Sequence, residues 1–192
     1  SIGIPNKNLI SLGNKPLLTY TVKSALDSGC FSKVIINSDS DEILNVGQEC
    51  GAEIQKREAN LALEDTTSIS VLEDSLKRIG DEYKKFALLQ PTSPLRNKSH
   101  ISESINTFEK NKLVSLVSVE RCTYLPQKCL VDRGDVIEPL LTKKHMTKPR
   151  QHLSPTYSVN GAIFLGIIQT FLSTLDFYQQ PLGIYEMSNE HS

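Results

Sequence analysis

Residues 89–96 combine more ligand-binding potential than any other short stretch of this chain. Their sequence is Leu-Gln-Pro-Thr-Ser-Pro-Leu-Arg, so two prolines flank two hydroxyl side chains directly after an apolar run. The prolines restrict the backbone of such a loop, which would hold Gln90 and exposed backbone groups in position at the end of a strand. We interpret this segment as a functional loop.

A lysine occurs in a second candidate loop, at residues 1–8. Gly3, Pro5 and Lys7 precede the first expected helix. Backbone amides of a glycine-containing turn, with an ammonium group beside them, suit a polyphosphate. The alternative is a surface loop with a solvated lysine, and the residue types by themselves favour that alternative.

Two carboxylates, Asp39 and Asp41, follow another apolar run. Carboxylate oxygens are the ligands that hard divalent cations prefer, so the pair could hold a metal ion. Alternatively, Asp39 and Glu42 form an Asp-x-x-Glu version of a helix capping box. We favour the cap. The four histidines show no metal-binding spacing, and we expect them on the surface.

The elements that must position these loops follow from hydrophobic periodicity. Continuous apolar runs predict strands that are covered on both faces, and stripes of apolar residues predict helices between them. This alternation predicts an α/β fold with right-handed crossovers, a mainly parallel sheet and helices on both faces. Ligands bind beyond the carboxyl ends of such strands, which points to residues 37–41, 90–96 and 120 onward. The predicted strands are 34–37, 86–89, 114–119, 161–166 and 182–187, and the predicted helices are 16–28, 69–79, 101–108 and 167–175.

Composition excludes several classes of partner. The chain has 192 residues, with 21 Lys and Arg against 22 Asp and Glu, so the net charge of −1 argues against nucleic acid or an acidic membrane surface. The longest apolar stretch, residues 161–168, is about half of the roughly 20 residues that a membrane span needs. The four cysteines are scattered without a Cys-x-x-Cys pair, which predicts reduced thiols in a cytoplasmic protein.

Residues 121–158 differ from the rest of the chain in composition and in hydrophobic periodicity. They contain four prolines and a group of basic residues, with little periodicity. We interpret them as an excursion from the sheet, which would be a flap, a subdomain or an arm that reaches a neighbouring subunit. The predicted organisation is therefore a nucleotide-binding α/β domain at 1–120 and 159–192, with an insertion at 121–158.

Several motifs in order resemble the acylneuraminate cytidylyltransferase family, the CMP-sialic acid synthetases. Residues 89–96 match the family's Leu-Gln-Pro-Thr-Ser-Pro-Leu-Arg signature. Residues 3–8 match the tail of its Arg-x-Gly-Ser-Lys-Gly-x-Pro-x-Lys-Asn loop, and residues 160–164 match its Asn-Gly-Ala-Ile-Tyr segment. The resemblance covers nearly the whole chain. It implies a Rossmann-like fold of the nucleotide-diphospho-sugar transferase type, with a dimerisation arm at 121–158.

The resemblance also implies a reaction. A nucleotidyltransferase of this family joins CTP to a sialic acid or related nonulosonic acid and releases pyrophosphate with the help of Mg²⁺. The anomeric hydroxyl attacks the α-phosphorus, and the product serves the synthesis of capsule or lipopolysaccharide. The family implies a homodimer with shared active sites and no nucleic acid or membrane partner.

The family's site residues carry over by motif to the nucleotide and the sugar acid. Lys7 would contact the triphosphate and Asn8 the nucleotide, whereas Arg57 and Ser68 would read cytosine. Gln90 would lie between the nucleotide and the sugar acid, and with Lys7 it would form the catalytic pair. The residues implied for the sugar acid and its surroundings are Lys128 and Arg150 from the partner's arm, Asn160, Phe164, and the neighbours Phe177 and Tyr178.

Three departures from the family pattern leave other functions open. Ile2 stands where the family loop has lysine, and Phe164 replaces a tyrosine. The loop's arginine and the magnesium-binding aspartates of a Ser-x-Asp-Ile-Asp segment would lie outside residues 1–192, so we expect both ends to be missing and no metal ligand within the chain. The alternatives are a catalytically impaired homologue that binds nucleotide, or a sugar nucleotidyltransferase of the same fold with another substrate.

Overall fold

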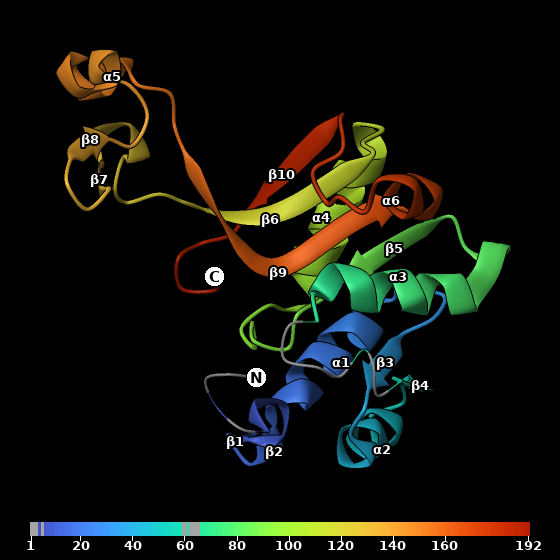
Figure 1. Cartoon of the computed structure of the whole chain (residues 1–192). Coiled ribbons are helices and arrows are strands. Elements are labelled where there is room, and N and C mark those ends of the chain that lie inside the picture. Colours follow the sequence, from blue (N-terminus) through green and yellow to red (C-terminus); the bar gives the residue numbers. More distant parts are fainter. Residues whose placement is uncertain (1–3, 5, 59–60, 62–65) are drawn as a thin grey trace.

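A four-stranded mixed sheet forms the centre of the molecule (Figure 1). The computed structural model describes residues 4, 6–58, 61 and 66–192. Strands β6 and β10 are parallel, whereas β9 is antiparallel to both of its neighbours, β6 and β5. The strand order is β10-β6-β9-β5, with bounds Leu182–Glu186, Ser115–Arg121, Tyr157–Ile167 and Lys85–Leu88.

A second, two-stranded parallel sheet lies in the N-terminal half. It consists of β3 (Ile35–Ser38) and β4 (Glu53–Lys56), which are joined by helix α2 (Asp41–Glu49). Helix α1 (Leu17–Ser28) contributes Leu18 and Val22 to the core beneath this sheet. The remaining short elements of this half are the 3-10 turn η1 (Lys7–Leu9) and the strands β1 (Ser11–Leu12) and β2 (Lys15–Pro16).

Helices cover both faces of the central sheet. On one face, α4 (Lys98–Lys110) buries Ile101 against Leu116 of β6. On the other face, α3 (Ser68–Ile79) and α6 (Ile168–Thr174) pack on the side of β5 that carries Phe86. The predicted α/β class, with helices on both faces, is confirmed. A 3-10 turn, η3 (Gly80–Glu82), follows α3.

The central sheet is mixed because β9 runs opposite to the other three strands, which all point the same way. The chain leaves β6 at Arg121 and returns at Tyr157, and these two residues are register partners. No helix carries the chain back across the sheet between them, so the returning strand runs in the opposite direction. Helical connections join strands of the same direction in two places, β3 to β4 through α2 and β5 to β6 through α4, whereas β9 departs from the expected pattern.

Residues between β6 and β9 form an arm that stands away from the sheet (Figure 1). It contains the hairpin of β7 (Leu130–Asp132) and β8 (Ile137–Pro139), helix α5 (Lys143–Thr147) and the 3-10 turns η4 (Pro126–Lys128) and η5 (Arg150–His152). Its exposed apolar side chains are Leu130, Val136, Ile137, Leu140 and Leu141.

Helix α2 begins one residue later than the capping-box prediction required. Its N-cap is Ser40, whose hydroxyl accepts from the backbone N–H of Ile43 at 3.4 Å. Asp39 is exposed and does not cap the helix, so that prediction is wrong. In contrast, α1 ends at Gly29 with φ 64°, as the Pro-to-Gly spacing predicted. No helix among the described residues is long and apolar enough to span a bilayer.

Candidate active site

Five of the predicted site residues line one cavity of about 1100 Å³. Its walls include β3 and β5, and an apolar part is lined by side chains such as Val22, Ile36 and Leu89. The polar part gathers residues from four places in the chain, which are the turn η1, the end of β4, the start of α3 and the end of β5. The five predicted residues are Lys7, Asn8, Arg57, Ser68 and Gln90.

Lys7 and Asn8 come from the turn η1. Asn6 starts this turn in the left-handed region, with φ 50°, and its carbonyl accepts from the N–H of Leu9 at 2.8 Å. The Oδ1 atom of Asn8 is buried, and no described residue donates to it. A buried carbonyl oxygen without a donor is costly, so this atom is well suited to accept a hydrogen bond from a ligand.

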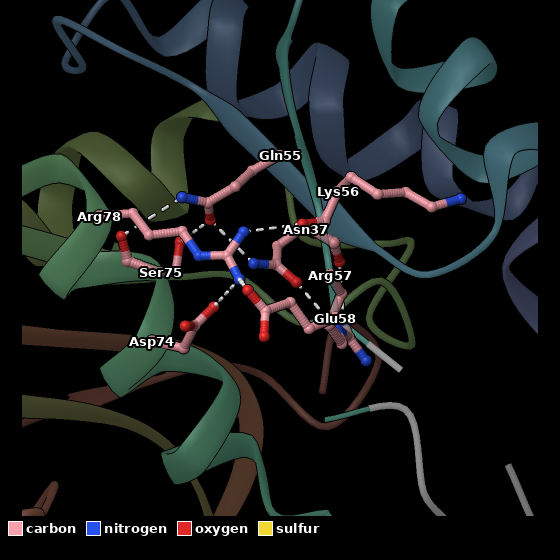
Figure 2. Close-up of polar contacts among 8 residues, drawn as sticks. All are labelled: Asn37, Gln55, Lys56, Arg57, Glu58, Asp74, Ser75 and Arg78. Atoms are coloured by element: carbon pink, nitrogen blue, oxygen red, sulfur yellow. Dashed lines mark hydrogen bonds and ion pairs between the residues drawn. The ribbon is translucent and has the colours of Figure 1, made fainter. Parts of the chain in front are cut away.

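Arg57 follows β4 and is fixed by Asn37 at the end of β3. Its Nε donates to Asn37 Oδ1 at 2.8 Å, and its Nη2 donates to the Asn37 carbonyl at 2.8 Å (Figure 2). The backbone N–H of Arg57 donates to the Ser38 carbonyl at 2.9 Å. A guanidinium has five N–H groups, and three of them have no acceptor among the described residues and so remain for a ligand.

Ser68 is the first residue of α3, and its side chain is exposed. The preceding residue, Thr67, caps the helix by accepting from the N–H of Ser70 at 3.1 Å. The Ser68 hydroxyl is thus not used for capping. It lies at the helix N-terminus, where backbone N–H groups favour an acceptor or an anion.

Gln90 begins the predicted functional loop directly after β5. Its carbonyl accepts from the N–H of Ser93 at 3.4 Å, and the Ser93 carbonyl accepts from the N–H of Arg96 at 3.2 Å. These contacts close two successive turns through the proline-containing segment. The Gln90 side chain lies against Gly161 of β9, which adopts φ 76°.

Arg96 of the same loop is buried, at 1% exposed, and does not line the cavity. Its guanidinium connects this loop to two other elements, β9 and α1. Its Nη1 donates to the carbonyls of Gln90 at 3.0 Å and Ala162 at 2.6 Å, and its Nη2 donates to Thr21 Oγ1 at 2.7 Å. Burial lowers the pKa of Arg96 to about 10. Sequence reasoning gave this residue no role, because an arginine in a loop carries no sign of burial.

Apart from Gln90, the residues predicted for the sugar acid do not line this cavity. Asn160 Oδ1 accepts from Ser118 Oγ at 2.6 Å and from the N–H of Ala162 at 3.1 Å, and its Nδ2 donates to Ser192 Oγ at 2.7 Å. Phe164 is 7% exposed in a core cluster with Val117 and Val119. Its ring lies 4.8 Å from that of Phe177, and Tyr178 is exposed.

Lys128 and Arg150 lie in the arm and do not line the cavity. The Lys128 ammonium donates to the carbonyls of Met146 and Lys148, both at 2.7 Å, so it ties η4 to the segment around α5. The third N–H of this ammonium has no acceptor among the residues that the structure describes. Arg150 is exposed in η5.

The described residues form no cluster of several magnesium ligands. They contain no group of three or more His, Cys, Asp or Glu side chains that could hold a metal ion. Of the two carboxylates considered for a cation, Asp41 is ion-paired with Lys56 and Asp39 is exposed. Ile2, the departure from the family's phosphate loop, lies outside the described residues.

The family follows from comparison with known proteins. A family model described as "Cytidylyltransferase" matches residues 1–191. The chain belongs to the cytidylyltransferase family. It is 34% identical over 193 residues to the N-acylneuraminate cytidylyltransferase of Escherichia coli O18:K1:H7 and 32% identical over 196 residues to that of Streptococcus agalactiae serotype III. It is 28% identical over 182 residues to the pseudaminic acid cytidylyltransferase of Campylobacter jejuni.

Coverage differs among these relatives of the cytidylyltransferase family. The first two align with 100% of this chain, which spans about half of their length, at 46% and 47%. The third aligns with 93% of this chain and 78% of its own. A solved CMP:2-keto-3-deoxy-manno-octonic acid synthetase complexed with CTP has the same fold, with a TM-score of 0.69 and 12% identity over 96% of this chain and 84% of its own.

Proposed function

We propose that the chain forms the nucleotide-binding part of an enzyme that transfers CMP from CTP to the anomeric hydroxyl of a sialic acid or related nonulosonic acid. The observation that carries this proposal is the convergence of Lys7, Asn8, Arg57, Ser68 and Gln90 on one cavity. These residues were selected by motif, and they come from separate loops. Membership of the cytidylyltransferase family supports the same chemistry.

Positioning and charge neutralisation supply most of the catalysis in such a transfer. The anomeric oxygen attacks the α-phosphorus, and the bond from that phosphorus to the bridging oxygen of the leaving pyrophosphate breaks. The Lys7 ammonium would lie on the triphosphate and offset its negative charge. Gln90 would hold the sugar acid in line with the α-phosphorus, because its amide can donate to one substrate and accept from the other.

The cytosine base would be held by Arg57, Ser68 and Asn8 in the polar part of the cavity. Arg57 has three N–H groups to offer, the Ser68 hydroxyl can donate or accept, and the buried Asn8 Oδ1 can accept. Cytosine presents two acceptors, O2 and N3, beside one exocyclic amino donor. This set of protein groups complements that pattern.

Magnesium would neutralise charge on the triphosphate when it is bound. The described residues contain no group of three or more His, Cys, Asp or Glu side chains that would hold it. The sugar substrate is proposed as a class, since relatives carry the names of N-acylneuraminate and pseudaminic acid enzymes. We place the reaction in the cytoplasm, as a step in making capsule or lipopolysaccharide.

We also propose a homodimer in which the arm completes the partner's site. Leu130, Ile137 and Leu141 of the arm are more than half exposed, at 58%, 66% and 53%. Exposed apolar groups of this kind indicate a protein interface. Lys128 and Arg150 lie on the same arm, so docking against a second copy would bring cations toward a sugar carboxylate.

Pyrophosphate release tests the proposed activity. The full-length protein is incubated with magnesium, each nucleoside triphosphate and a panel of nonulosonic acids. We expect pyrophosphate only with CTP and at least one of these acids. Release with UTP or GTP but not CTP would instead identify a sugar nucleotidyltransferase with another substrate, and nucleotide binding without any release would identify an impaired homologue.

Mixed dimers test the shared site. Gln90→Ala and Arg150→Ala each inactivate a homodimer if the two residues act in one site from different subunits. Mixing the two inactive proteins then restores part of the activity, because one site of each mixed dimer is intact. A monomer in analytical ultracentrifugation, or no recovery after subunit exchange, contradicts the shared site.

A further inference from the structure

A row of hydrogen-bonded polar side chains connects Ser75 of helix α3 to Arg57 (Figure 2). Ser75 Oγ donates to Gln55 Oε1 at 2.5 Å, and Asn37 Nδ2 donates to the same oxygen at 2.8 Å. Asn37 Oδ1 in turn accepts from Arg57 Nε at 2.8 Å. Three consecutive hydrogen bonds thus connect a helix to the guanidinium.

The two strands and α3 place these groups in one layer. Asn37 and Gln55 are register partners in the parallel β3–β4 pair, so their side chains point to the same face. Helix α3 covers that face with Ser75, which is buried. Polar groups in such a layer must satisfy one another, which restricts the conformations that they can adopt.

The direction of each hydrogen bond is determined by a backbone carbonyl. Gln55 Nε2 faces the Ser75 carbonyl at 3.5 Å, and a carbonyl can only accept. The Gln55 oxygen must then face Asn37, which turns the Asn37 amino group toward Gln55 and the Asn37 oxygen toward Arg57. Reversing either amide would set two donors or two acceptors against each other.

Asn37 therefore holds one edge of the Arg57 guanidinium, and no other described residue accepts from it. Nε and one Nη2 N–H are taken by Asn37, which leaves both Nη1 N–H groups and one Nη2 N–H. Such a fork matches two adjacent acceptors, as in O2 and N3 of cytosine. Uracil carries a hydrogen on N3, which would face the donors of the guanidinium.

We infer that Asn37, Gln55 and Ser75 are positioning residues that orient Arg57 and so set the preference for cytosine over uracil. This inference rests on the proposed function and adds three residues to it. Asn37 and Ser75 line the same cavity as Arg57, whereas Gln55 does not line it and acts only through its hydrogen bonds. A freely rotating arginine would still attract the triphosphate, but it would contribute less to the choice of base.

A double-mutant cycle separates this role from a general effect on folding. Calorimetry with magnesium measures the affinities for CTP and UTP in Gln55→Met, Arg57→Ala and the double variant. Ser75→Ala is measured beside Ser104→Ala. Ser104 is a matched control, because it is a fully buried helical serine whose hydroxyl donates to Ile101 within its own helix. Thermal unfolding followed by circular dichroism checks that each variant is folded.

We expect Gln55→Met to lower CTP affinity by about threefold to tenfold, the worth of one hydrogen bond, with a smaller effect on UTP. In the Arg57→Ala background we expect Gln55→Met to cause no further loss of CTP affinity, because Gln55 acts through Arg57. Ser75→Ala shows the same selective loss, and Ser104→Ala leaves both affinities unchanged.

Two results overturn the inference while leaving the proposed function intact. One is an additive effect of Gln55→Met and Arg57→Ala on CTP affinity. The other is an equal loss for CTP and UTP in the Gln55 and Ser75 variants. If the wild-type chain prefers another nucleotide, the proposed function fails, and the cycle repeated with that nucleotide still tests whether Gln55 acts through Arg57. Absence of all nucleotide binding overturns both.

Discussion

The Oε1 atom of Gln90 lies 2.7 Å from the position that a β-carbon on Gly161 would occupy. This approach brings the loop after β5 against β9, although 71 residues separate them in the chain. Gly161 also adopts φ 76°, a conformation that side chains other than glycine disfavour. Glycine at this position therefore serves two purposes, the backbone conformation of β9 and the placement of the Gln90 amide.

Gly161→Ala should reduce both stability and turnover. The positive φ costs about 1–2 kcal/mol of unfolding free energy, and the new β-carbon displaces the Gln90 side chain. Gly29→Ala is the control, because Gly29 has a similar φ of 64° with no atom within 4 Å of a β-carbon. Urea unfolding and pyrophosphate release are measured for both. Equal turnover in the two variants would contradict a role of Gly161 in positioning the Gln90 side chain.

Arg57→Ala should weaken CTP binding by about 1–3 kcal/mol, which is the cost of leaving the base contact unsatisfied. Calorimetry measures the affinity. Arg133→Ala is a suitable control, since Arg133 is exposed on the arm and makes only a 4.0 Å ion pair with Glu138. An unchanged CTP affinity in the Arg57 variant would exclude this residue from the nucleotide site.

Arg96→Met should destabilise the fold by about 2–4 kcal/mol, because it removes the donors of two carbonyls and a hydroxyl that stay buried. Arg96→Lys should recover part of this loss, since an ammonium can still donate to some of these acceptors. The free energy of unfolding from urea titration gives the result. A loss below about 0.5 kcal/mol, the size of an ordinary surface effect, would show that the hydrogen bonds of Arg96 contribute little to the free energy of unfolding.

Acid should destabilise the chain through His100. Burial holds the pKa of His100 below its ordinary value of 6.5, and the nearby His191 and Arg96 lower it further against the opposing effect of Glu103. The neutral ring also accepts from the N–H of Asn97 at 3.3 Å, in the capping box of α4. The unfolded chain thus binds a proton more readily, so stability is lost as pH falls below about 6.5.

His100→Gln removes the titrating group while keeping a side chain that can accept from Asn97. We expect its unfolding free energy to vary less than that of the wild type between about pH 7 and about pH 5.5, above the range in which carboxylates titrate. Urea unfolding at several pH values provides the comparison. Parallel curves for the two proteins would show that another group causes the acid sensitivity.

Local sequence patterns were sufficient for most of the elements. The apolar runs at 34–37, 86–89 and 114–119 correspond to β3, β5 and β6, and the stripe at 69–79 corresponds to α3. The spacing of apolar residues in these segments indicates which face of a helix or strand is buried. This spacing can be read directly from the sequence. The cap of α2 was misplaced by one residue, since Ser40 and Asp39 are both good caps and only the backbone conformation selects one.

Burial of polar side chains could not be predicted in the same way. Arg96 was placed in the functional loop without a role of its own, and it is buried. His100 was expected on the surface, and it is half-buried.

Asn37 lay in the strand end that was expected to bind a ligand, but its contact with Arg57 was not predicted. Gln55 and Ser75 gave no signal, because each is a common polar residue whose partners lie in other elements. A hydrogen bond between distant segments has no counterpart in local periodicity.

The sequence by itself determined the α/β class, the limits of the main helices and strands, and the motifs that identify a cytidylyltransferase. Only the tertiary structure decided the direction of β9, the convergence of five candidate residues on one cavity, and the row of hydrogen bonds that holds Arg57. The physical reason is the range of the interactions. Amphipathic patterns act between residues that are near in the chain, whereas strand pairing and directional hydrogen bonds depend on which distant segments meet.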